Sequence, residues 1–286
     1  MRKILYRKDR KNRKVSGFGK VNGICLALVL ALGMTGVPVF SAMAATPWAV
    51  ENGSCVDASG NVVQGAVAKG ISVSKYQNRA SVNGIDWNAV KGDGVSFAMV
   101  RLGYLNDMDP NFAENMVNAS GAGVKTGVFF YTQALNVETA KQEAEYVLSV
   151  IKDYPVSYPV AYDVESQYLL DNGVSSEQLT EQINVFCKII ADAGYTPMIY
   201  VNNEWLTTHM DITKIPYDVW YARYGTVNEC QNRTIWQATD QGSVAGIEGA
   251  VTIELAFKDY APQVAVADPA GVGSSAGGPG VVKPEN

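Results

Sequence analysis

The feature of the sequence that most restricts its fold is a regular alternation that begins at Gly70. From there, short apolar runs alternate with segments of helical periodicity, an order typical of a parallel sheet whose strands are joined by helices. The pattern predicts the α/β class and a single TIM-like β/α barrel, with little helix between the last strands. We expect strands at residues 71–74, 97–102, 125–131, 160–163, 198–201, 219–222, 234–238 and 251–255.

Two of the connecting helices carry clear local signals. Residues 137–152 place their apolar side chains on one stripe at helical spacing. Residues 176–193 follow Ser175, an expected N-cap with Gln178 three positions on, and precede Gly194, a typical helix stop. Shorter helices are expected at residues 87–91, 111–120 and 203–209.

Both ends of the chain differ from this regular part. Residues 1–44 hold nine Lys or Arg, an apolar run and Ala42-Met43-Ala44, an order typical of a secretory signal peptide. A retained membrane anchor is the alternative. Residues 45–66 are expected to form a short N-terminal lead-in with hairpin signals, and residues 67–261 the barrel. Residues 262–286, rich in Gly, Ala and Pro without periodicity, predict a disordered tail.

The charge balance restricts the partners of the chain. The whole sequence has 23 basic and 28 acidic residues; without residues 1–44 it has 14 and 27, a net charge of −13. Such a surface repels nucleic acid and anionic lipid, which argues against both as partners. We expect a secreted monomer without a stable membrane anchor once the signal is removed.

The cysteine and histidine content argues against several kinds of site. Cys55, Cys187 and Cys230 lie too far apart for a zinc motif, and three cysteines allow at most one disulfide. Cys187, on an apolar helix face, is expected in the core. His209 is the single histidine, so a Ser-His-Asp site or a His-rich metal site is not expected. Nothing in the sequence indicates a metal or an organic cofactor.

The clearest candidate site is the Asp-x-Glu at the end of the fourth expected strand. Asp163 and Glu165 are two residues apart, so strand alternation directs both side chains to one face, with Val164 on the other. Burial and a like-charged neighbour raise the pKa of such a pair and keep a proton available for donation. Glycosidic bond cleavage uses this arrangement. The alternative is a strand end whose acids are solvated or hold loop amides.

Several motifs in order resemble the glycoside hydrolase family 25 lysozymes over about residues 70–260. They are Gly70-Ile71-Ser72-Val73-Ser74-Lys75-Tyr76-Gln77, Ile85-Asp86-Trp87, Phe97-Ala98-Met99-Val100-Arg101-Leu102-Gly103-Tyr104, Tyr162-Asp163-Val164-Glu165, and Trp236-Gln237 followed by Gly246-Ile247-Glu248-Gly249. The resemblance implies a flattened β/α barrel, located at the cell wall, that cleaves the β-1,4 bond between N-acetylmuramic acid and N-acetylglucosamine in peptidoglycan. It also implies Glu165 as general acid and Asp163 as the residue that orients the substrate's 2-acetamido group, in substrate-assisted retention.

Two positions depart from the family pattern. Ser72 and Thr252 stand where the family has aspartates, so hydroxyl groups replace two of its four active-site acids. Glu254 lies two residues beyond Thr252 on the same strand face, and we expect either that it supplies the missing carboxylate or that it faces solvent beyond the barrel rim.

Aromatic side chains at strand ends are candidates for contacts with sugar rings, with core packing as the alternative for each. The candidates for substrate binding, together with Ser72, Thr252 and Glu254, are Tyr104, Tyr131, Tyr200, Trp220, Tyr224 and Trp236, with Arg101, Gln133 and Asn202 as hydrogen-bonding partners.

Two functions from different classes fit these residues. The first is an exported muramidase that acts on peptidoglycan glycan strands. The second is a peptidoglycan-binding pseudoenzyme that has lost catalysis through Ser72 and Thr252. An enzyme that uses the same pair on another amino-sugar polymer is a third.

Overall fold

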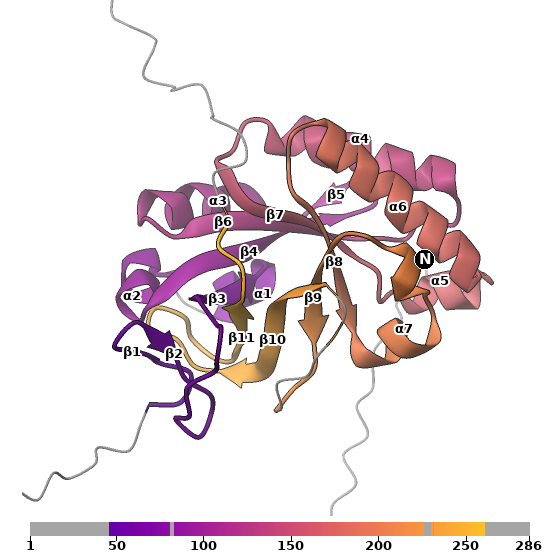
Figure 1. Cartoon of the computed structure of the whole chain (residues 1–286). Coiled ribbons are helices and arrows are strands. Elements are labelled where there is room, and N and C mark those ends of the chain that lie inside the picture. The colour runs from indigo at the N-terminus through magenta and orange to yellow at the C-terminus, as the bar shows by residue number, and fades with distance from the viewer. Residues whose placement is uncertain (1–45, 81–82, 226–229, 231, 261–286) are drawn as a thin grey trace, which may run out of the picture. The chain divides into compact units, whose positions relative to one another are not determined.

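The central feature of the fold is a closed barrel. The computed structural model describes residues 46–80, 83–225, 230 and 232–260. Within these ranges nine strands form one sheet, and eight of them close into a barrel because β3 pairs with both β11 and β4 (Figure 1). In chain order the nine strands are β3 (Ala68–Val73), β4 (Val95–Tyr104), β5 (Asp107–Met108), β6 (Lys125–Tyr131), β7 (Val156–Asp163), β8 (Pro197–Asn202), β9 (Asp218–Ala222), β10 (Arg233–Gly242) and β11 (Val251–Ala256). The predicted α/β barrel and its eight strands are confirmed, and β5 is a short addition to the edge of β4.

Strand β11 departs from the predicted parallel order. The pairs from β3 to β4 and onward to β10 are parallel, whereas β11 is antiparallel to both of its neighbours. The connection between β10 and β11, residues 243–250, is too short for the crossover that a parallel pair requires. Along β11 the chain therefore runs from the carboxyl ends of the other barrel strands into the barrel.

The helices include those that the sequence predicts and two that it does not. The predicted helices are α2 (Trp87–Gly92), α3 (Phe112–Gly121), α4 (Val137–Ile151), α6 (Ser176–Asp192) and α7 (Asn203–Thr208). Ser175 and Gln178 form the expected capping box of α6. Two more are α1 (Lys75–Ala80) and α5 (Gln167–Asp171), and a 3₁₀ turn, η1, spans Ile212–Lys214.

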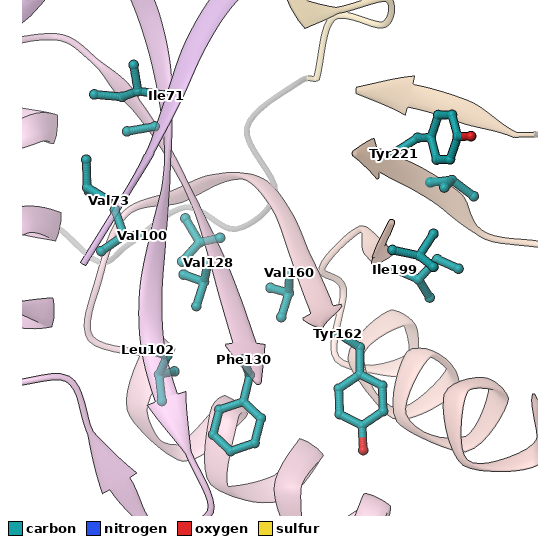
Figure 2. Close-up of a cluster of buried hydrophobic side chains, with 14 of the residues drawn as sticks. Ile71, Val73, Val100, Leu102, Val128, Phe130, Val160, Tyr162, Ile199 and Tyr221 are labelled. Carbon is teal, nitrogen blue, oxygen red and sulfur yellow. The ribbon is translucent and has the colours of Figure 1, made fainter. Parts of the chain in front are cut away.

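Buried apolar side chains form two layers, one on each face of the barrel strands. On the outer face, side chains such as Ile71, Val100 and Val160, which Figure 2 labels, belong to one buried cluster with apolar side chains of the helices. Cys187 of α6 belongs to this layer and is fully buried, as predicted. The inner layer fills the barrel with larger side chains, including Phe97, Met99, Tyr158, Met198 and Trp220. Because the interior is filled, space for a ligand is left at the end of the barrel and not along its axis.

The residues before β3 pack on strands β10 and β11 of the barrel. The short strands β1 (Val50–Glu51) and β2 (Ser54–Cys55) form a hairpin. The Trp48 ring meets the Trp236 ring edge-on at 6.0 Å between centroids, and the Val67 amide donates to the Ala256 carbonyl at 2.8 Å. These contacts cover strands β10 and β11, which are joined by the helix-free residues 243–250.

The predicted signal peptide, residues 1–44, and the predicted tail, residues 262–286, lie outside the described residues. In the described part of the chain, no helix combines the length and the apolar character needed to span a membrane. The three described cysteines form no disulfide with one another.

Candidate active site

The carboxyl ends of the barrel strands surround a pocket of about 230 Å³. Strand ends and the loops after them supply its wall, which consists of Ser72, Phe129, Asp163, Glu165, Tyr200, Trp220, Tyr224, Gln237 and Thr252. Both acids of the Asp-x-Glu thus line one pocket, while Val164 between them is fully buried on the other side. The pocket therefore joins two carboxyl groups with aromatic faces.

Asp163 is a buried acid with an unsatisfied oxygen. Asp163 is 6% exposed, and its Oδ1 has no hydrogen-bond partner among the described residues. Burial raises the pKa of Asp163 well above its usual range, and the charge of Glu165 adds to the effect; the Glu165 backbone amide and Arg101 oppose it. A buried acceptor without a partner is costly, so Oδ1 is a ready site for a substrate donor.

Glu165 lies just beyond β7 and is fixed by an amide. Asn202 Nδ2 donates to Glu165 Oε2 at 2.7 Å, and Asn202 Oδ1 accepts from the Trp205 backbone amide at 3.0 Å as the N-cap of α7. Burial raises the pKa of Glu165, and the hydrogen bond from Asn202 partly opposes this rise. Helix α7 thereby orients the second acid of the pair.

Ser72 and Thr252 meet at the floor of the pocket. Their hydroxyl oxygens are 2.6 Å apart, and the Ser72 backbone amide donates to Thr252 Oγ1 at 3.0 Å. Strands β3 and β11 place them side by side, because the antiparallel register that pairs Glu254 with Gly70 brings Thr252 opposite Ser72. The two departures from the family pattern are therefore in direct contact.

Glu254 lies inside the barrel, beneath the pocket. It is completely buried, and Oε2 accepts from Trp220 Nε1 at 2.7 Å while Oε1 accepts from Gln237 Nε2 at 3.2 Å. The expectation that Glu254 faces solvent beyond the rim is wrong, because the antiparallel β11 carries it inward from Thr252. Burial raises the pKa of Glu254 to about 7, against hydrogen bonds from Thr252, Trp220, Gln237 and Ser72.

Three of the predicted aromatic residues, Tyr200, Trp220 and Tyr224, line the pocket. Tyr200 is 8% exposed, and its hydroxyl donates to Gln237 Oε1 at 3.1 Å. The Trp220 ring meets Tyr200 edge-on at 4.6 Å and Phe129 at 5.7 Å between centroids. Buried aromatic packing thus holds the pocket wall in place.

The other three predicted aromatic residues lie away from the pocket wall. Trp236 is 1% exposed and belongs to the outer layer, where it packs on Trp48 and donates from Nε1 to the Arg223 carbonyl at 2.8 Å. The prediction that Trp236 contacts the substrate is corrected here: strand alternation turns Gln237 inward and Trp236 outward. Tyr104 is half-buried beside Arg101.

Tyr131 ends β6 opposite Asp163. Burial raises the pKa of Tyr131, and a hydrogen bond with the Ser166 side chain opposes the rise. It stays close to the acid pair without lining the pocket.

Sequence reasoning did not single out Phe129 or Gln237 as contacts. Both carry a signal that alternation provides: Phe129 lies two residues before Tyr131 on the inner face of β6, and Gln237 follows the outward-facing Trp236.

Comparison with known proteins decides the family. The family described as "Glycosyl hydrolases family 25" matches residues 71–247. The chain belongs to this family of glycoside hydrolases. The resemblance of the sequence motifs is thereby confirmed.

Two curated relatives are similar to this chain over about two thirds of its length. Lysozyme M1 of Streptomyces globisporus is 28% identical over 200 residues, which cover 64% of this chain and 65% of the relative. The uncharacterized protein YegX of Escherichia coli K12 is 26% identical over 196 residues, 65% of this chain and 68% of YegX. The chain thus spans about two thirds of the length of these curated relatives.

Solved structures show the same fold. A family 25 glycosyl hydrolase from Bacillus anthracis gives a TM-score of 0.59 at 20% identity, with coverage of 68% of this chain and 91% of that one. The bacterial lysozyme from Streptomyces coelicolor gives a TM-score of 0.55 at 24% identity, with coverage of 65% of this chain and 90% of that one.

Proposed function

We propose that this family 25 chain is an exported muramidase that hydrolyses the β-1,4 bond between N-acetylmuramic acid and N-acetylglucosamine in peptidoglycan. The observation that carries the proposal is the pair Asp163 and Glu165, which line one pocket and both have raised pKa values. The named likeness to Lysozyme M1 supports the substrate class. The proposed site of action is the cell wall, outside the cell.

In the proposed reaction, Glu165 is the general acid. It gives its proton to the leaving glycosidic oxygen as the bond to the anomeric carbon breaks. The carbonyl oxygen of the 2-acetamido group forms a new bond to that carbon, while Asp163 accepts a hydrogen bond from the acetamido N–H. A water molecule then attacks the anomeric carbon and gives a proton to Glu165, while the bond from that carbon to the acetamido oxygen breaks and restores the acetamido group. The two successive displacements retain the configuration.

The distribution of the proton between the two acids fits these roles once substrate is bound. In the free pocket, Asp163 is the more strongly perturbed acid because its burial is deeper and Oδ1 lacks a partner among the described residues. An acetamido N–H at Oδ1 would favour ionised Asp163. The like-charged pair would then hold its proton on Glu165, where the reaction requires it.

The second candidate function is peptidoglycan binding without catalysis. It is favoured by the contact of Ser72 with Thr252, which leaves two hydroxyl groups where the family pattern has two acids. Hydroxyl groups hydrogen-bond but carry no charge, so they do not add to the field at the acid pair.

One digestion separates the two functions. Purified peptidoglycan is incubated with the mature protein and with its Glu165→Gln variant, and new reducing ends are measured. We expect release by the natural protein and a loss of at least about hundredfold in the variant, because the amide has no acidic proton to transfer to the leaving oxygen. Chitin oligosaccharides serve as a second substrate, which tests whether the pair acts on another amino-sugar polymer.

The control for this digestion is Glu204→Gln, an acid at the start of α7 outside the pocket wall. It should act like the natural protein. Sedimentation of the natural protein with the wall, without new reducing ends, would support the binding function and contradict the enzyme.

A further inference from the structure

A buried amide connects the pocket wall to the acid beneath it. Gln237 is 3% exposed, and its Nε2 donates to Glu254 Oε1 at 3.2 Å. On its other side, Gln237 Oε1 accepts from the Tyr200 hydroxyl at 3.1 Å and the Tyr224 hydroxyl at 3.0 Å. One side chain therefore joins the interior acid to two tyrosines of the pocket.

The acid determines which way this amide points. Glu254 has a donor on each carboxyl oxygen, Trp220 Nε1 at Oε2 and Gln237 Nε2 at Oε1, and hydroxyl hydrogen bonds from Ser72 and Thr252 add to them. An indole N–H only donates, and Glu254 only accepts once it is ionised, which requires a pH above its raised pKa of about 7. Gln237 must therefore turn its NH₂ group toward Glu254 and its oxygen toward the tyrosines.

The orientation of the amide determines the polarity of the pocket wall. A tyrosine hydroxyl has one proton to donate, and both Tyr200 and Tyr224 donate it to Gln237. Their remaining lone pairs are left for a ligand, and both residues line the pocket beside Asp163 and Glu165. This part of the wall accepts hydrogen bonds and does not donate them.

We propose that Glu254 is a positioning residue that acts through Gln237 to make Tyr200 and Tyr224 hydrogen-bond acceptors, and so selects sugars that present O–H or N–H donors at this wall. The proposal rests on the proposed function, since it concerns the same pocket. It also gives Glu254 a role different from that of a missing catalytic acid, because Glu254 does not line the pocket.

The test reverses the polarity and then restores it. In Glu254→Gln, the new amide keeps its oxygen toward Trp220 and turns NH₂ toward Gln237, which must then present its own NH₂ to the tyrosines. In the double variant Glu254→Gln with Gln237→Glu, a carboxylate again accepts from both tyrosines, while the amide introduced at position 254 donates to it. The double variant and the natural protein carry the same two side chains at exchanged positions, so composition is matched.

The kinetic measurement uses soluble peptidoglycan oligosaccharides at about pH 8, above the pKa of about 7 at which Glu254 ionises. We expect the KM of the single variant to rise about tenfold or more with a smaller change in kcat, because contacts at this wall exist in both the ground and transition states. The double variant should return KM to within about threefold of the natural value. A single variant whose KM stays within about twofold, or a folded double variant that restores nothing, would overturn the proposal.

Two further measurements keep the outcomes distinct. In a Glu165→Gln background, calorimetric titration with the same oligosaccharides measures binding without cleavage, and the same loss and recovery of affinity are expected. If the natural protein cleaves nothing, but affinity falls in Glu254→Gln and recovers in the double variant, the hydrolase proposal fails and this one stands. If the variants do not fold, neutron diffraction of the natural protein decides, since a Tyr200 hydroxyl hydrogen directed into the pocket contradicts the proposal.

Discussion

At the scale of single residues, the acid pair depends on one amide. Asn202 donates to Glu165 and caps α7 at the same time, so it fixes the position of the proposed acid and moderates its pKa. Alternation along β7 was sufficient to predict from sequence that Asp163 and Glu165 share a side. The partner amide comes from another strand, and a single sequence does not indicate which residue of β8 reaches Glu165.

Replacing Asn202 by Ser tests this dependence. Serine keeps the ability to cap α7 but is too short to reach the carboxylate, so the hydrogen bond that lowers the pKa of Glu165 is lost. The pKa should rise, and the alkaline limb of kcat/KM, where the acid loses its proton, should move to higher pH. Asn203→Ala, which leaves the bond to Glu165 in place, is the control. An unmoved alkaline limb in Asn202→Ser would contradict this account.

At the scale of elements, the eight strands were predictable and the direction of one was not. Apolar runs locate strands because burial requires them, but they carry no information about direction. The length of residues 243–250 was the available signal for an antiparallel β11, and it decides whether Glu254 faces solvent or the interior. The inward-facing Gln237 was missed for a related reason, since the adjacent Trp236 suggested a sugar contact and is a core residue.

The segment before β3 also acts as a structural element of the barrel. Trp48 is 9% exposed and packs on Trp236, whose Nε1 holds the Arg223 carbonyl next to the pocket residue Tyr224. Trp48→Ala should lower the free energy of unfolding by about 3 kcal/mol, as expected for a large buried aromatic side chain, and raise KM as Tyr224 loses its support. Urea unfolding and kinetics measure the two effects.

The matched control is Trp48→Phe, which keeps an aromatic ring against Trp236 and should retain most of the stability. Val50→Ala, at an exposed position of the same hairpin, should change neither quantity. Equal stability of Trp48→Ala and the natural protein would show that the segment contributes nothing to the barrel.

At the scale of the whole molecule, buried acids connect stability to pH. Burial raises the pKa values of Glu143, Asp163, Glu165 and Glu254, so the folded protein binds more protons than the unfolded chain. When the folded state holds the extra protons, the free energy of unfolding falls as pH rises between the unfolded and the folded pKa values. For Glu254 this window runs from the ordinary value of 4.5 to about 7.

Glu254→Gln should therefore flatten the dependence of stability on pH. A shift of the pKa from 4.5 to about 7 corresponds to roughly 3 kcal/mol of unfolding free energy. The natural protein loses this free energy across the window, whereas the variant, which has no proton to lose at position 254, does not. Urea unfolding at several pH values between about 4 and 8 would measure the two slopes. Glu138→Gln, which removes an acid whose side chain is 70% exposed on α4, should leave the slope of the natural protein unchanged. Identical slopes in Glu254→Gln and the natural protein would mean that Glu254 has the same pKa in the folded protein as in the unfolded chain, with its hydrogen bonds fully offsetting the burial of its charge.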